Sequence, residues 1–539
     1  MTGKPAARRD DKTLKGGPIT QGSRNVFIGT AGGVACSTCP NGVAPEGNPV
    51  NPLLGAKIQA GEVDLALPGP MPFVVSRDYS SYQTDTPAPV GLLGPGWWLP
   101  TESSVLQTDD ALTLNDTKGR SIRFEPLAPG ESAFSRSESL WIVRGGLETL
   151  EDTLAFRLHT AWSALHIDDR RNPSLFFITN NPLGPWWIFG PNPPTGPLEG
   201  QRLFLLGLSD RFRQALHIQR DAAGVMTAVQ DGAGRQYRLE LKTLPHVANE
   251  GSGGWGSDSG QRLMAVYLSR DPHHPVLPKE PLVRYEYSPR GELAAVFGRD
   301  GSEQRRFQYH PHLPGRMTGH NYAGREPVSY VYNNDGKVIE QHRPGLLSYR
   351  FNYQADSTVV TDSLGRTRTY HFKGKDGLRR VVQLEHADGS ITQSRFDASG
   401  RLVASIDALG RETYFQLDVA TGNLLSITLP DGSQSHWSSN EHGQVVEHTN
   451  VQGASQLTRY DQLGRLSQVT DGLKQTTRFH YADDQSEYAS TIEDANGGKK
   501  HLAWTAMAQL ASYTDCSGHT THYRYDRWGQ QVQVKGEEC

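Results

Sequence analysis

Histidine is the residue type in this chain best suited to chemistry, because its imidazole exchanges protons near neutral pH and binds transition metals. Three groups among the 19 histidines are close enough in sequence to suggest a shared ligand: His273-His274, His310-Pro311-His312 and His519-Thr520-Thr521-His522. The first pair lies between two prolines, where successive side chains point apart, and the last pair flanks a predicted turn. Because these arrangements give two imidazoles no common scaffold, we interpret the residues as solvated histidines and expect no bound metal.

Carboxylates are the second candidate for catalysis. Adjacent pairs occur at Asp168-Asp169 and Asp483-Asp484, but glycoside hydrolysis needs two carboxylates that converge across a cleft, which adjacency in sequence does not provide. The chain also contains no G-x-S-x-G nucleophile elbow, Walker loop or H-E-x-x-H zinc motif. We therefore predict that this chain is not an enzyme. A hydrolase stays open as an alternative that would need a convergent acid pair.

The four cysteines cannot form a disulfide framework for a chain of 539 residues, which is compatible with folding in a reducing compartment. They are Cys36, Cys39, Cys516 and Cys539. The C-x-x-C pair at Cys36 and Cys39 offers two of the four ligands that zinc takes. We interpret it as a surface loop with two free thiols, while a zinc ion shared with a distant histidine remains conceivable. No cofactor is expected.

Charge and hydropathy exclude several classes of function. The net charge is -4, so nothing draws the whole chain to nucleic acid or to an anionic membrane. Apolar runs such as Leu203 to Leu208 are far shorter than the roughly 20 residues that cross a bilayer. The first residues lack the apolar region of a secretory signal. Export would therefore use a route that needs no signal peptide.

Glycine spacing indicates the elements that carry all these residues. One series, spaced by 22, 21, 21 and 65 residues, is Gly400, Gly422, Gly443, Gly464 and Gly529. A second series, spaced by 21, 22, 21, 19, 25 and 21 residues, is Gly389, Gly410, Gly432, Gly453, Gly472, Gly497 and Gly518. The two series interleave, so a turn is predicted about every ten residues. The dipeptides Asp388-Gly389, Asp431-Gly432, Asp471-Gly472 and Asn496-Gly497 tolerate the positive φ of such turns.

Between these turns lie segments of about seven residues in which apolar side chains alternate. In one of them Leu402, Ala404 and Ile406 share a face, as period-two geometry requires. Alternation is imperfect, since Gln468 and Thr470 share a face with Leu466. The pattern predicts an all-β array of hairpins whose faces are too polar for a tight sandwich core. A large sheet that winds around a space would tolerate such faces.

Three repeats carry a sharper motif at the turn. They are Tyr460-Asp461-Gln462-Leu463-Gly464-Arg465-Leu466, Phe396-Asp397-Ala398-Ser399-Gly400-Arg401-Leu402 and Tyr525-Asp526-Arg527-Trp528-Gly529. We expect the aromatic residue to end a strand, the Asp to bond amides of its own turn, the Gly to take a left-handed conformation and the Leu to open the next strand. The role of these residues is therefore structural.

This motif and its period resemble the YD-repeat proteins of the Rhs family, over roughly residues 205 to 539. Residues 47 to 100 resemble the segment that precedes the repeats in bacterial Rhs proteins, through Gly47-Asn48-Pro49-Val50-Asn51-Pro52, Arg77-Asp78-Tyr79 and Leu93-Gly94-Pro95-Gly96-Trp97, among other ordered matches. The resemblance implies a spiral of antiparallel β-hairpins that forms a shell, here incomplete at the C-terminal end. We expect Trp97 and Trp98 to plug an end of this sheet.

The N-terminus resembles part of a PAAR domain, the conical tip that sits on the spike of a type VI secretion system. The matching residues include Pro5, Ala6, Ala7 and Arg8. The stretch has no His, so the zinc site of that family is not carried over. The expected organisation is a truncated PAAR-like tip at 1–35, a linker at 36–46, an N-terminal Rhs-associated β domain at 47–195 and a YD-repeat shell at 196–539.

The resemblance implies containment and delivery of a C-terminal toxin that this chain lacks. Implied partners are the toxin as cargo, the trimeric spike protein, a chaperone and an immunity protein, and the implied location is the bacterial cytoplasm before delivery. The Asp271-Pro272 step is interpreted as a loop and not as a self-cleavage site. An array cut at residue 539 is expected to leave an unpaired edge and to associate poorly alone.

A cell-surface adhesin is the alternative from a different class. It would bind carbohydrate by stacking sugars on exposed tryptophans, and the candidates are Trp97, Trp98, Trp186, Trp187 and Trp437.

Overall fold

The computed structural model describes residues 46–83, 87–116, 121–150, 155–192, 201–245, 254–375 and 378–537. The chain divides into Met1–Gly32 and Gly33–Cys539, and the first part contains none of the described residues. The PAAR-like residues Pro5, Ala6, Ala7 and Arg8 and the C-x-x-C pair at Cys36 and Cys39 therefore lie outside the described part. Strands make up 48% of the structure and helices 4%, so the all-β prediction is confirmed.

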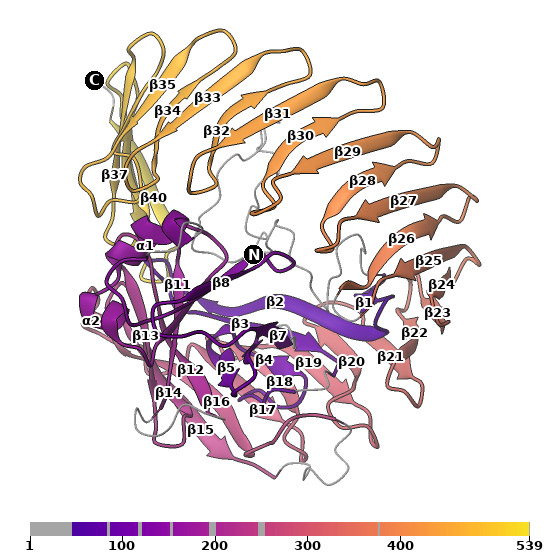
Figure 1. Cartoon of the computed structure of the whole chain (residues 1–539). Coiled ribbons are helices and arrows are strands. Elements are labelled where there is room, and N and C mark those ends of the chain that lie inside the picture. The colour runs from indigo at the N-terminus through magenta and orange to yellow at the C-terminus, as the bar shows by residue number, and fades with distance from the viewer. Residues whose placement is uncertain are drawn as a thin grey trace. The chain divides into compact units, whose positions relative to one another are not determined.

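A small antiparallel sheet comes first in the chain. Its strands, in the order β1-β2-β3-β4, are β1 (Val50–Asn51), β2 (Ala56–Ala66), β3 (Val74–Ser80) and β4 (Trp97–Trp98). A short helix, η1 (Pro100–Glu102), follows it. Figure 1 shows this sheet in indigo alongside strands β18 to β20.

In the described residues the second sheet, which we call the wall, runs from β8 to β40, and each of its 33 strands except the last pairs antiparallel with the next. Figure 1 shows the row of hairpins from β20 to β35. The first wall strands are β8 (Ser132–Ser135), β9 (Leu140–Arg144), β10 (Phe176–Thr179), β11 (Trp186–Gly190), β12 (Arg202–Ser209), β13 (Ala215–Arg220), β14 (Met226–Gln230), β15 (Gln236–Thr243), β16 (Gln261–Arg270), β17 (Val283–Tyr287), β18 (Leu293–Gly298), β19 (Glu303–Tyr309) and β20 (Met317–Tyr322). The middle strands are β21 (Val328–Tyr332), β22 (Val338–His342), β23 (Tyr349–Tyr353), β24 (Ser357–Asp362), β25 (Thr367–Lys373), β26 (Arg380–Glu385), β27 (Ile391–Phe396), β28 (Leu402–Ile406), β29 (Glu412–Leu417) and β30 (Leu424–Thr428). The last are β31 (Gln434–Ser439), β32 (Val445–Thr449), β33 (Ser455–Tyr460), β34 (Leu466–Thr470), β35 (Thr476–His480), β36 (Thr491–Glu493), β37 (Lys499–Trp504), β38 (Leu510–Thr514), β39 (Thr520–Tyr525) and β40 (Gln531–Glu537).

The wall forks at β12. The first half of β12 pairs with β5 (Ser104–Gln107) and the second half with β13, while β11 lies along the other edge. From β5 the branch continues to β6 (Leu112–Asn115) and β7 (Ser121–Phe124). The ladder from β11 to β12 also crosses the domain boundary that was expected near residue 195, so the segments on both sides share one sheet.

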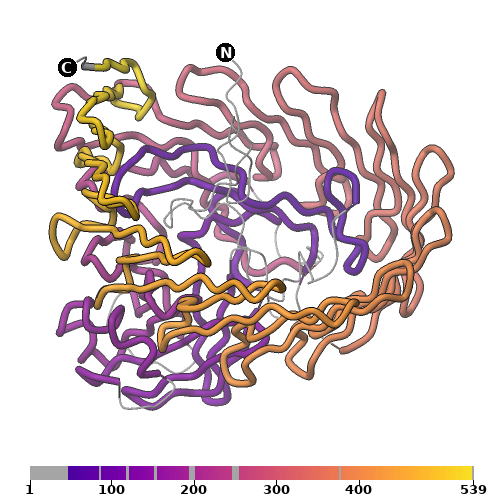
Figure 2. Tube along the Cα trace, turned by 90° about the horizontal axis from the view of Figure 1, so that it is seen from above, coloured from indigo at the N-terminus to yellow at the C-terminus, as the bar shows by residue number. Residues whose placement is uncertain are grey.

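Side chains near the end of the chain return to its first part, although the backbone ladder does not close on itself. The Arg299 guanidinium lies 4.2 Å from the ring centre of Trp528, which follows β39. Trp528 also packs against the core that the small sheet forms with the early wall strands. Figure 2 shows the yellow C-terminal hairpins on the same side as the magenta segment. The hairpin array therefore curves until the turn after β39 contacts the turn between β18 and β19 and the core beside it.

Fully buried apolar side chains are confined to the first three quarters of the chain in its described part. The largest core cluster joins the small sheet to the wall strands up to β20, and a second cluster extends to β26. Ala404 is the last buried apolar residue among the described residues. The wall beyond it, from 405 to 536, contains no buried apolar side chain in its described part.

Trp97 is part of the core and does not plug an end of the sheet as expected. Its ring is fully buried between Tyr79 and Phe307, with ring centres 5.0 Å and 4.9 Å away. Its indole N–H donates to the hydroxyl of Tyr309 at 2.7 Å. Trp97 therefore fixes the small sheet to the face of β19, because an amphipathic ring is stable there when its polar atom finds a partner.

Buried charges reinforce the same contact. Arg77 in β3 is fully buried and donates to Glu62 at 2.8 Å and to Asp64 at 2.7 Å. The hydroxyl of Tyr285, from wall strand β17, also donates to Asp64 at 2.9 Å. Burial works against ionisation of Glu62, but Arg77 and further partners outweigh it and lower the pKa of that carboxyl to about 2. Removing one member would leave a charge unpaired in the interior, so the network locks the small sheet in place.

A helical insert between β9 and β10 was not predicted. It consists of η2 (Ala155–Leu158), α1 (His159–Ala164) and α2 (Ile167–Arg171). Leu158, Ala161, Trp162 and Leu165 are buried and follow the spacing of one helix face. Trp162 packs edge-on against Phe177 and Trp186 of the wall.

Among the described residues, no helix has the length and apolar content that crossing a membrane requires.

Candidate functional site

The repeat turns are the candidate site, and Asp461 organises the clearest one. Tyr460 is the last residue of β33, and Leu466 is the first residue of β34. Between them, one carboxylate oxygen of Asp461 accepts the amides of Leu463 at 3.0 Å and Arg465 at 2.8 Å. Gly464 has a φ of 70°, which only glycine adopts at little cost. The aromatic residue, the Asp, the Gly and the Leu occupy the expected positions in this turn.

Arg465 adds a clamp that the sequence analysis named but did not explain. Its Nε donates to the second carboxylate oxygen of Asp461 at 2.6 Å, and its Nη1 donates to the carbonyls of Asp483 at 2.6 Å and Ser486 at 2.7 Å. Its guanidinium also lies 4.1 Å from the ring centre of Tyr481. One arginine therefore closes its own turn and holds the chain about 20 residues further on, with its side chain only 8% exposed.

A second link joins successive repeats through the aromatic residue. The hydroxyl of Tyr460 donates to the carbonyl of Val445 at 3.0 Å, and Tyr481 donates to Leu466 at 2.8 Å. The same bond, always across 15 residues, recurs as Tyr332 to Met317, Trp504 to Ala489 and Tyr525 to Leu510. In most cases the acceptor is the residue that opens the second strand of the preceding hairpin. Each repeat is therefore fastened to the one before it by a side chain as well as by the ladder.

The other two sharp motifs vary the same turn. Asp397 accepts the amides of Ser399 and Arg401, and the Nε of Arg401 at 2.7 Å. Burial opposes ionisation of Asp397, but the bonds from Arg401 prevail and lower the pKa of its carboxyl. Phe396 ends β27, Gly400 has a φ of 74° and Leu402 opens β28.

The turn at Asp526 keeps the loop and lacks the arginine. Tyr525 ends β39, and Asp526 accepts the amides of Trp528 and Gln530, each at 2.8 Å. Gly529 has a φ of 79°. Because residue 530 is Gln, the carboxylate of Asp526 has no guanidinium at the clamp position. The geometry of the turn therefore depends on Asp and Gly, and the arginine strengthens it.

The two glycine series occupy two different rims of the wall. At the first series an added Cβ would lie 2.8 Å from Arg380 at Gly400, 2.9 Å from Arg401 at Gly422 and 2.6 Å from Leu183 at Gly464. We call this the packed rim. At six glycines of the second series an added Cβ would meet no atom within 4 Å, namely Gly389, Gly410, Gly432, Gly453, Gly497 and Gly518, whereas at Gly472 it would lie 3.0 Å from Ala454. We call this the open rim.

One turn of the open rim, at Asp471, differs from the predicted conformation. Gly472 does not have a positive φ, and Lys474 takes the left-handed conformation instead, with a φ of 66°. Asp471 accepts the amides of Leu473 and Gln475, which places Lys474 where the other turns have glycine. The Asp-based loop therefore sets the position of the left-handed residue, and the nearby glycine does not.

The last quarter of the wall has two unequal faces. Strand β31 alternates between exposed and half-buried residues, and so do β27 and most of β29. The half-buried face carries a stripe of cross-strand pairs, which we call the apolar stripe: Phe415 with Ile427, Trp437 with His448, and Phe479 with Ile492. The other face carries charged residues such as Arg395 and Arg459. A second packed layer would bury the apolar stripe. Because the residues of the stripe are only half-buried, no such layer covers them in the described part of the chain.

The proposed tryptophan platforms are not a set of exposed rings. Trp97 and Trp186 are fully buried. Trp98, Trp187 and Trp437 are half-buried, and Trp437 stacks on His448 with ring centres 4.7 Å apart. A sugar could not reach the first two, so the geometry does not assemble a carbohydrate platform from these residues.

Most of the histidine and acid groups considered above lie in turns, whereas Asp168-Asp169 lies in α2 and His522 lies in β39. Asp271 accepts the amide of His273 at 3.0 Å, and His274 lies 3.1 Å from the same carboxylate. Asp483 accepts the amide of Gln485 in a turn, and Asp484 is almost fully exposed. None of these pairs converges on another within the described ranges. A different group, His159 with Glu441 and His442, is brought together by the fold.

Two family models match the chain. One, described as Teneurin YD-shell, matches residues 312–538. The other, described as a domain of unknown function, DUF6531, matches residues 47–124. The two matches fall on the repeats and on the segment that precedes them.

Curated relatives extend over nearly the whole chain. Toxin protein Tse5 of Pseudomonas aeruginosa is 35% identical over 535 residues, which covers 96% of this chain and 38% of that protein. Double-stranded DNA deaminase toxin A of Burkholderia cenocepacia is 27% identical over 510 residues, with 90% of this chain and 30% of that protein covered. Probable deoxyribonuclease RhsB of Dickeya dadantii is 22% identical, with 62% and 27% covered. The chain thus spans well under half the length of these relatives.

Among solved structures, the crystal structure of TcdB2-TccC3-Cdc42 matches with a TM-score of 0.40 and 10% identity, covering 91% of this chain and 27% of that one. The repeat turns, the matched family models and the Rhs relatives agree with one another. The chain belongs to the Rhs family of YD-repeat proteins.

Proposed function

We propose that this chain forms part of a shell that encloses a toxin domain of a longer protein and protects it until delivery. The observation that carries the proposal is the half-buried apolar stripe on a wall that has no buried apolar side chain from 405 to 536 in its described part. Such a face suits contact with a loosely held polypeptide better than contact with a fixed second layer. The names of the relatives, which include two toxins, point the same way.

The names of these relatives also support a division of labour. One is named a DNA deaminase toxin and another a probable deoxyribonuclease. Both are similar to more than half of the residues of this chain. A region shared by proteins with different activities is suited to enclose or deliver the active domain and not to catalyse its reaction. We therefore propose that this chain is not catalytic and that the toxin activity resides elsewhere in the full gene product.

Confinement would follow from the wall's construction. Backbone hydrogen bonds join neighbouring strands without a break from β8 to β40, so a protease finds no free strand within the sheet. The bonds from Tyr460 and Tyr481 to the preceding repeats resist separation of hairpins. The contact between Arg299 and Trp528 holds the late wall against the early wall.

Delivery by a type VI secretion system is the finer part of the proposal. It is supported by the resemblance of Pro5, Ala6, Ala7 and Arg8 to a PAAR tip. In this account a complete tip would seat the protein on the trimeric spike, a chaperone would assist loading, and an immunity protein would neutralise the toxin in the producing cell. The protein would reside in the bacterial cytoplasm before delivery.

Limited proteolysis of the full-length gene product tests containment. We expect the region that follows residue 539 to resist cleavage in the intact protein. It should become sensitive when the wall is weakened by Asp461→Ala together with Tyr481→Phe. Equal sensitivity of the C-terminal region in both proteins, at the same protease dose, would contradict containment.

The secretion route needs a separate test. Competition between bacteria should show killing by the wild-type strain and none by a strain whose type VI sheath is inactivated. If killing persists without the sheath, the type VI assignment is wrong, while the containment result is unaffected.

A further inference from the structure

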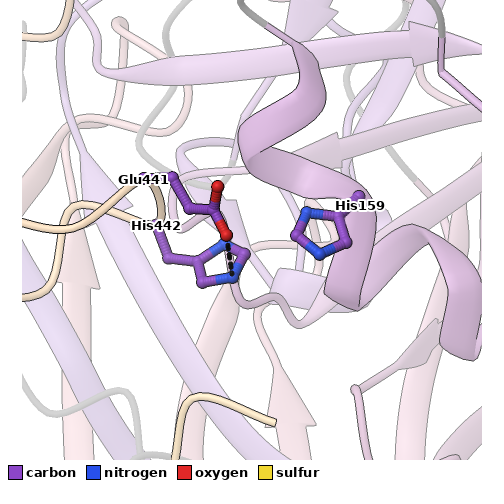
Figure 3. A group of neighbouring side chains, drawn as sticks. All are labelled: His159, Glu441 and His442. Carbon is purple, nitrogen blue, oxygen red and sulfur yellow. Dashed lines mark ion pairs between the residues drawn. The ribbon is translucent and has the colours of Figure 1, made fainter. Parts of the chain in front are cut away.

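The helical insert and a wall turn bring three metal-binding side chains together. His159 is the first residue of α1, whereas Glu441 and His442 lie in the turn between β31 and β32. One nitrogen of each histidine and one carboxylate oxygen lie within 4.8 Å of one another. Figure 3 shows the three side chains facing a common space, with Glu441 and His442 on one side and His159 on the other.

Backbone carbonyls fix both imidazoles in the orientation that metal ligands use. His442 Nδ1 lies 2.9 Å from the carbonyl oxygen of Arg157, and His159 Nδ1 lies 2.9 Å from that of Phe156. A carbonyl oxygen only accepts, so each Nδ1 carries the hydrogen and donates it. Each Nε2 then presents a lone pair to the shared space. Metal-bound histidines characteristically donate their other ring nitrogen to such an oxygen.

The hydroxyl of Thr160 cannot satisfy both lone pairs at once. Its Oγ1 lies 3.3 Å from His159 Nε2 and 3.2 Å from His442 Nε2. A hydroxyl has one hydrogen, so it can donate to one of these nitrogens at a time. A cation that accepts electron density from both nitrogens resolves this competition.

The surroundings suit a partly open site. The side chain of His442 is 8% exposed and that of Glu441 is 54% exposed, so one side of the space is protein and the other is open to water. An open coordination position on the Glu441 side could hold a water molecule.

We propose that His159, Glu441 and His442 bind one Zn²⁺ ion or a similar transition-metal ion, which joins the helical insert to the wall. Two imidazoles and a carboxylate are a known zinc set, whereas Mg²⁺ and Ca²⁺ prefer oxygen ligands alone. A tetrahedral ion with bonds of about 2.1 Å places its ligands about 3.4 Å apart. The Oε1 atom of Glu441 and the Nε2 atom of His442 are 3.7 Å apart, so small side-chain rotations would bring these atoms to the ligand spacing.

The ion would act as a staple in the repeat array. Thr160 and His442 are 282 residues apart in sequence, so one ion would connect the start of the wall to its last quarter. The contact at Gly464 and Leu183 lies on the same packed rim. The proposal is independent of the toxin and of the secretion route.

Zinc binding by the full chain tests the proposal. The protein is stripped of metal and carries Cys36→Ser and Cys39→Ser, which removes the C-x-x-C pair as a competing site. Equilibrium dialysis against Zn²⁺ should then give one ion per chain. His159→Gln and Glu441→Gln should each weaken binding at least tenfold, and excess Mg²⁺ should not displace the ion.

His166→Gln is the matched control, since this histidine lies on the same insert and its side chain is 70% exposed. It should bind Zn²⁺ as the parent does. Zn²⁺ should also raise the melting temperature of the parent and of this control, and not that of Glu441→Gln, whose exposed side chain leaves folding intact. Unchanged Zn²⁺ affinity in Glu441→Gln and His159→Gln, or no binding once the two cysteines are replaced, would overturn the proposal.

Discussion

The hydroxyl of Tyr481 donates a 2.8 Å hydrogen bond to the carbonyl of Leu466, 15 residues earlier in the chain. Leu466 opens the strand that follows the Asp461 turn, and Arg465 lies against the ring of the same tyrosine. One aromatic side chain therefore connects the end of one repeat with the turn of the preceding one. The stability of the array should depend on these links in a measurable way.

Tyr481→Phe removes this bond while keeping the ring. We expect the free energy of unfolding to fall by about 1 kcal/mol, the net value of one hydrogen bond in a partly buried place. Urea unfolding followed by circular dichroism measures the change. Tyr414→Phe is the control, since that ring is 47% exposed, and it should change stability less than Tyr481→Phe does. If both substitutions changed the free energy of unfolding equally, the Tyr481 hydrogen bond would not stabilise the array.

Asp461→Asn tests the clamp without removing the turn, because an amide oxygen can still accept the backbone amides. The substitution leaves the buried Arg465 guanidinium without its carboxylate, so we expect a loss of about 2 kcal/mol. Asp407→Asn is the matched control. Asp407 and Arg411 are 2.7 Å apart in the same local geometry, but their side chains are 40% and 61% exposed. Water screens that pair, so its loss should cost much less than the loss at Asp461. If Asp461→Asn and Asp407→Asn lowered the free energy of unfolding by the same amount, the clamp at Asp461 would not be stabilising.

Gly464→Ala and Gly453→Ala separate backbone strain from packing. Both glycines have a positive φ, 70° and 79°, so each alanine costs about 1 kcal/mol for the left-handed conformation alone. At Gly464 the new Cβ would lie 2.6 Å from Leu183, whereas at Gly453 it would meet no atom within 4 Å. Gly464→Ala should therefore be the more destabilising by at least about 1 kcal/mol, measured by differential scanning calorimetry. The reverse order would show that the packed rim is not packed in solution.

His320 should make the fold sensitive to acid. It is 5% exposed, and burial, followed by the charge of Lys57, lowers its pKa from 6.5 to about 3. The unfolded chain therefore binds more protons than the folded chain between these pH values, so the free energy of unfolding falls as the pH drops through this range.

The corresponding variant is His320→Phe, which cannot be protonated. Between about pH 7 and about pH 5 it should lose roughly 2 kcal/mol less stability than the parent. His217→Phe, at an exposed position in β13, should retain the parent's pH dependence. If all three proteins lose stability in parallel, His320 is not the residue that titrates.

Local rules were sufficient to predict most of the repeat architecture. The order aromatic, Asp, Gly and Leu determines where a strand ends, how its turn closes and where the next strand begins, and all of this lies within seven residues. At Asp471 the prediction was wrong. The Asp-Gly dipeptide predicted a left-handed Gly472, but the loop that Asp471 organises places Lys474 in the left-handed conformation. The helical insert was predictable, since Leu158, Ala161, Trp162 and Leu165 already show helical spacing.

Contacts between distant repeats could not be predicted in the same way. No local signal in the sequence pairs His159 with His442 or Leu183 with Gly464, because these contacts depend on how the twist of each hairpin accumulates along the wall. The recurrence of the tyrosine bond at 15 residues is intermediate: the period suggested neighbouring repeats, but the acceptor carbonyl emerges only from the register of the strands.

Residues 405 to 536 should form one side of an enclosure and not one layer of a filled core. A cryo-electron microscopy map of the full-length gene product would distinguish the two arrangements. We expect the apolar stripe at Phe415, Trp437 and Phe479 to face density from the C-terminal region inside the shell. A map in which a second ordered sheet packs on that stripe, with the C-terminal region outside, would contradict it.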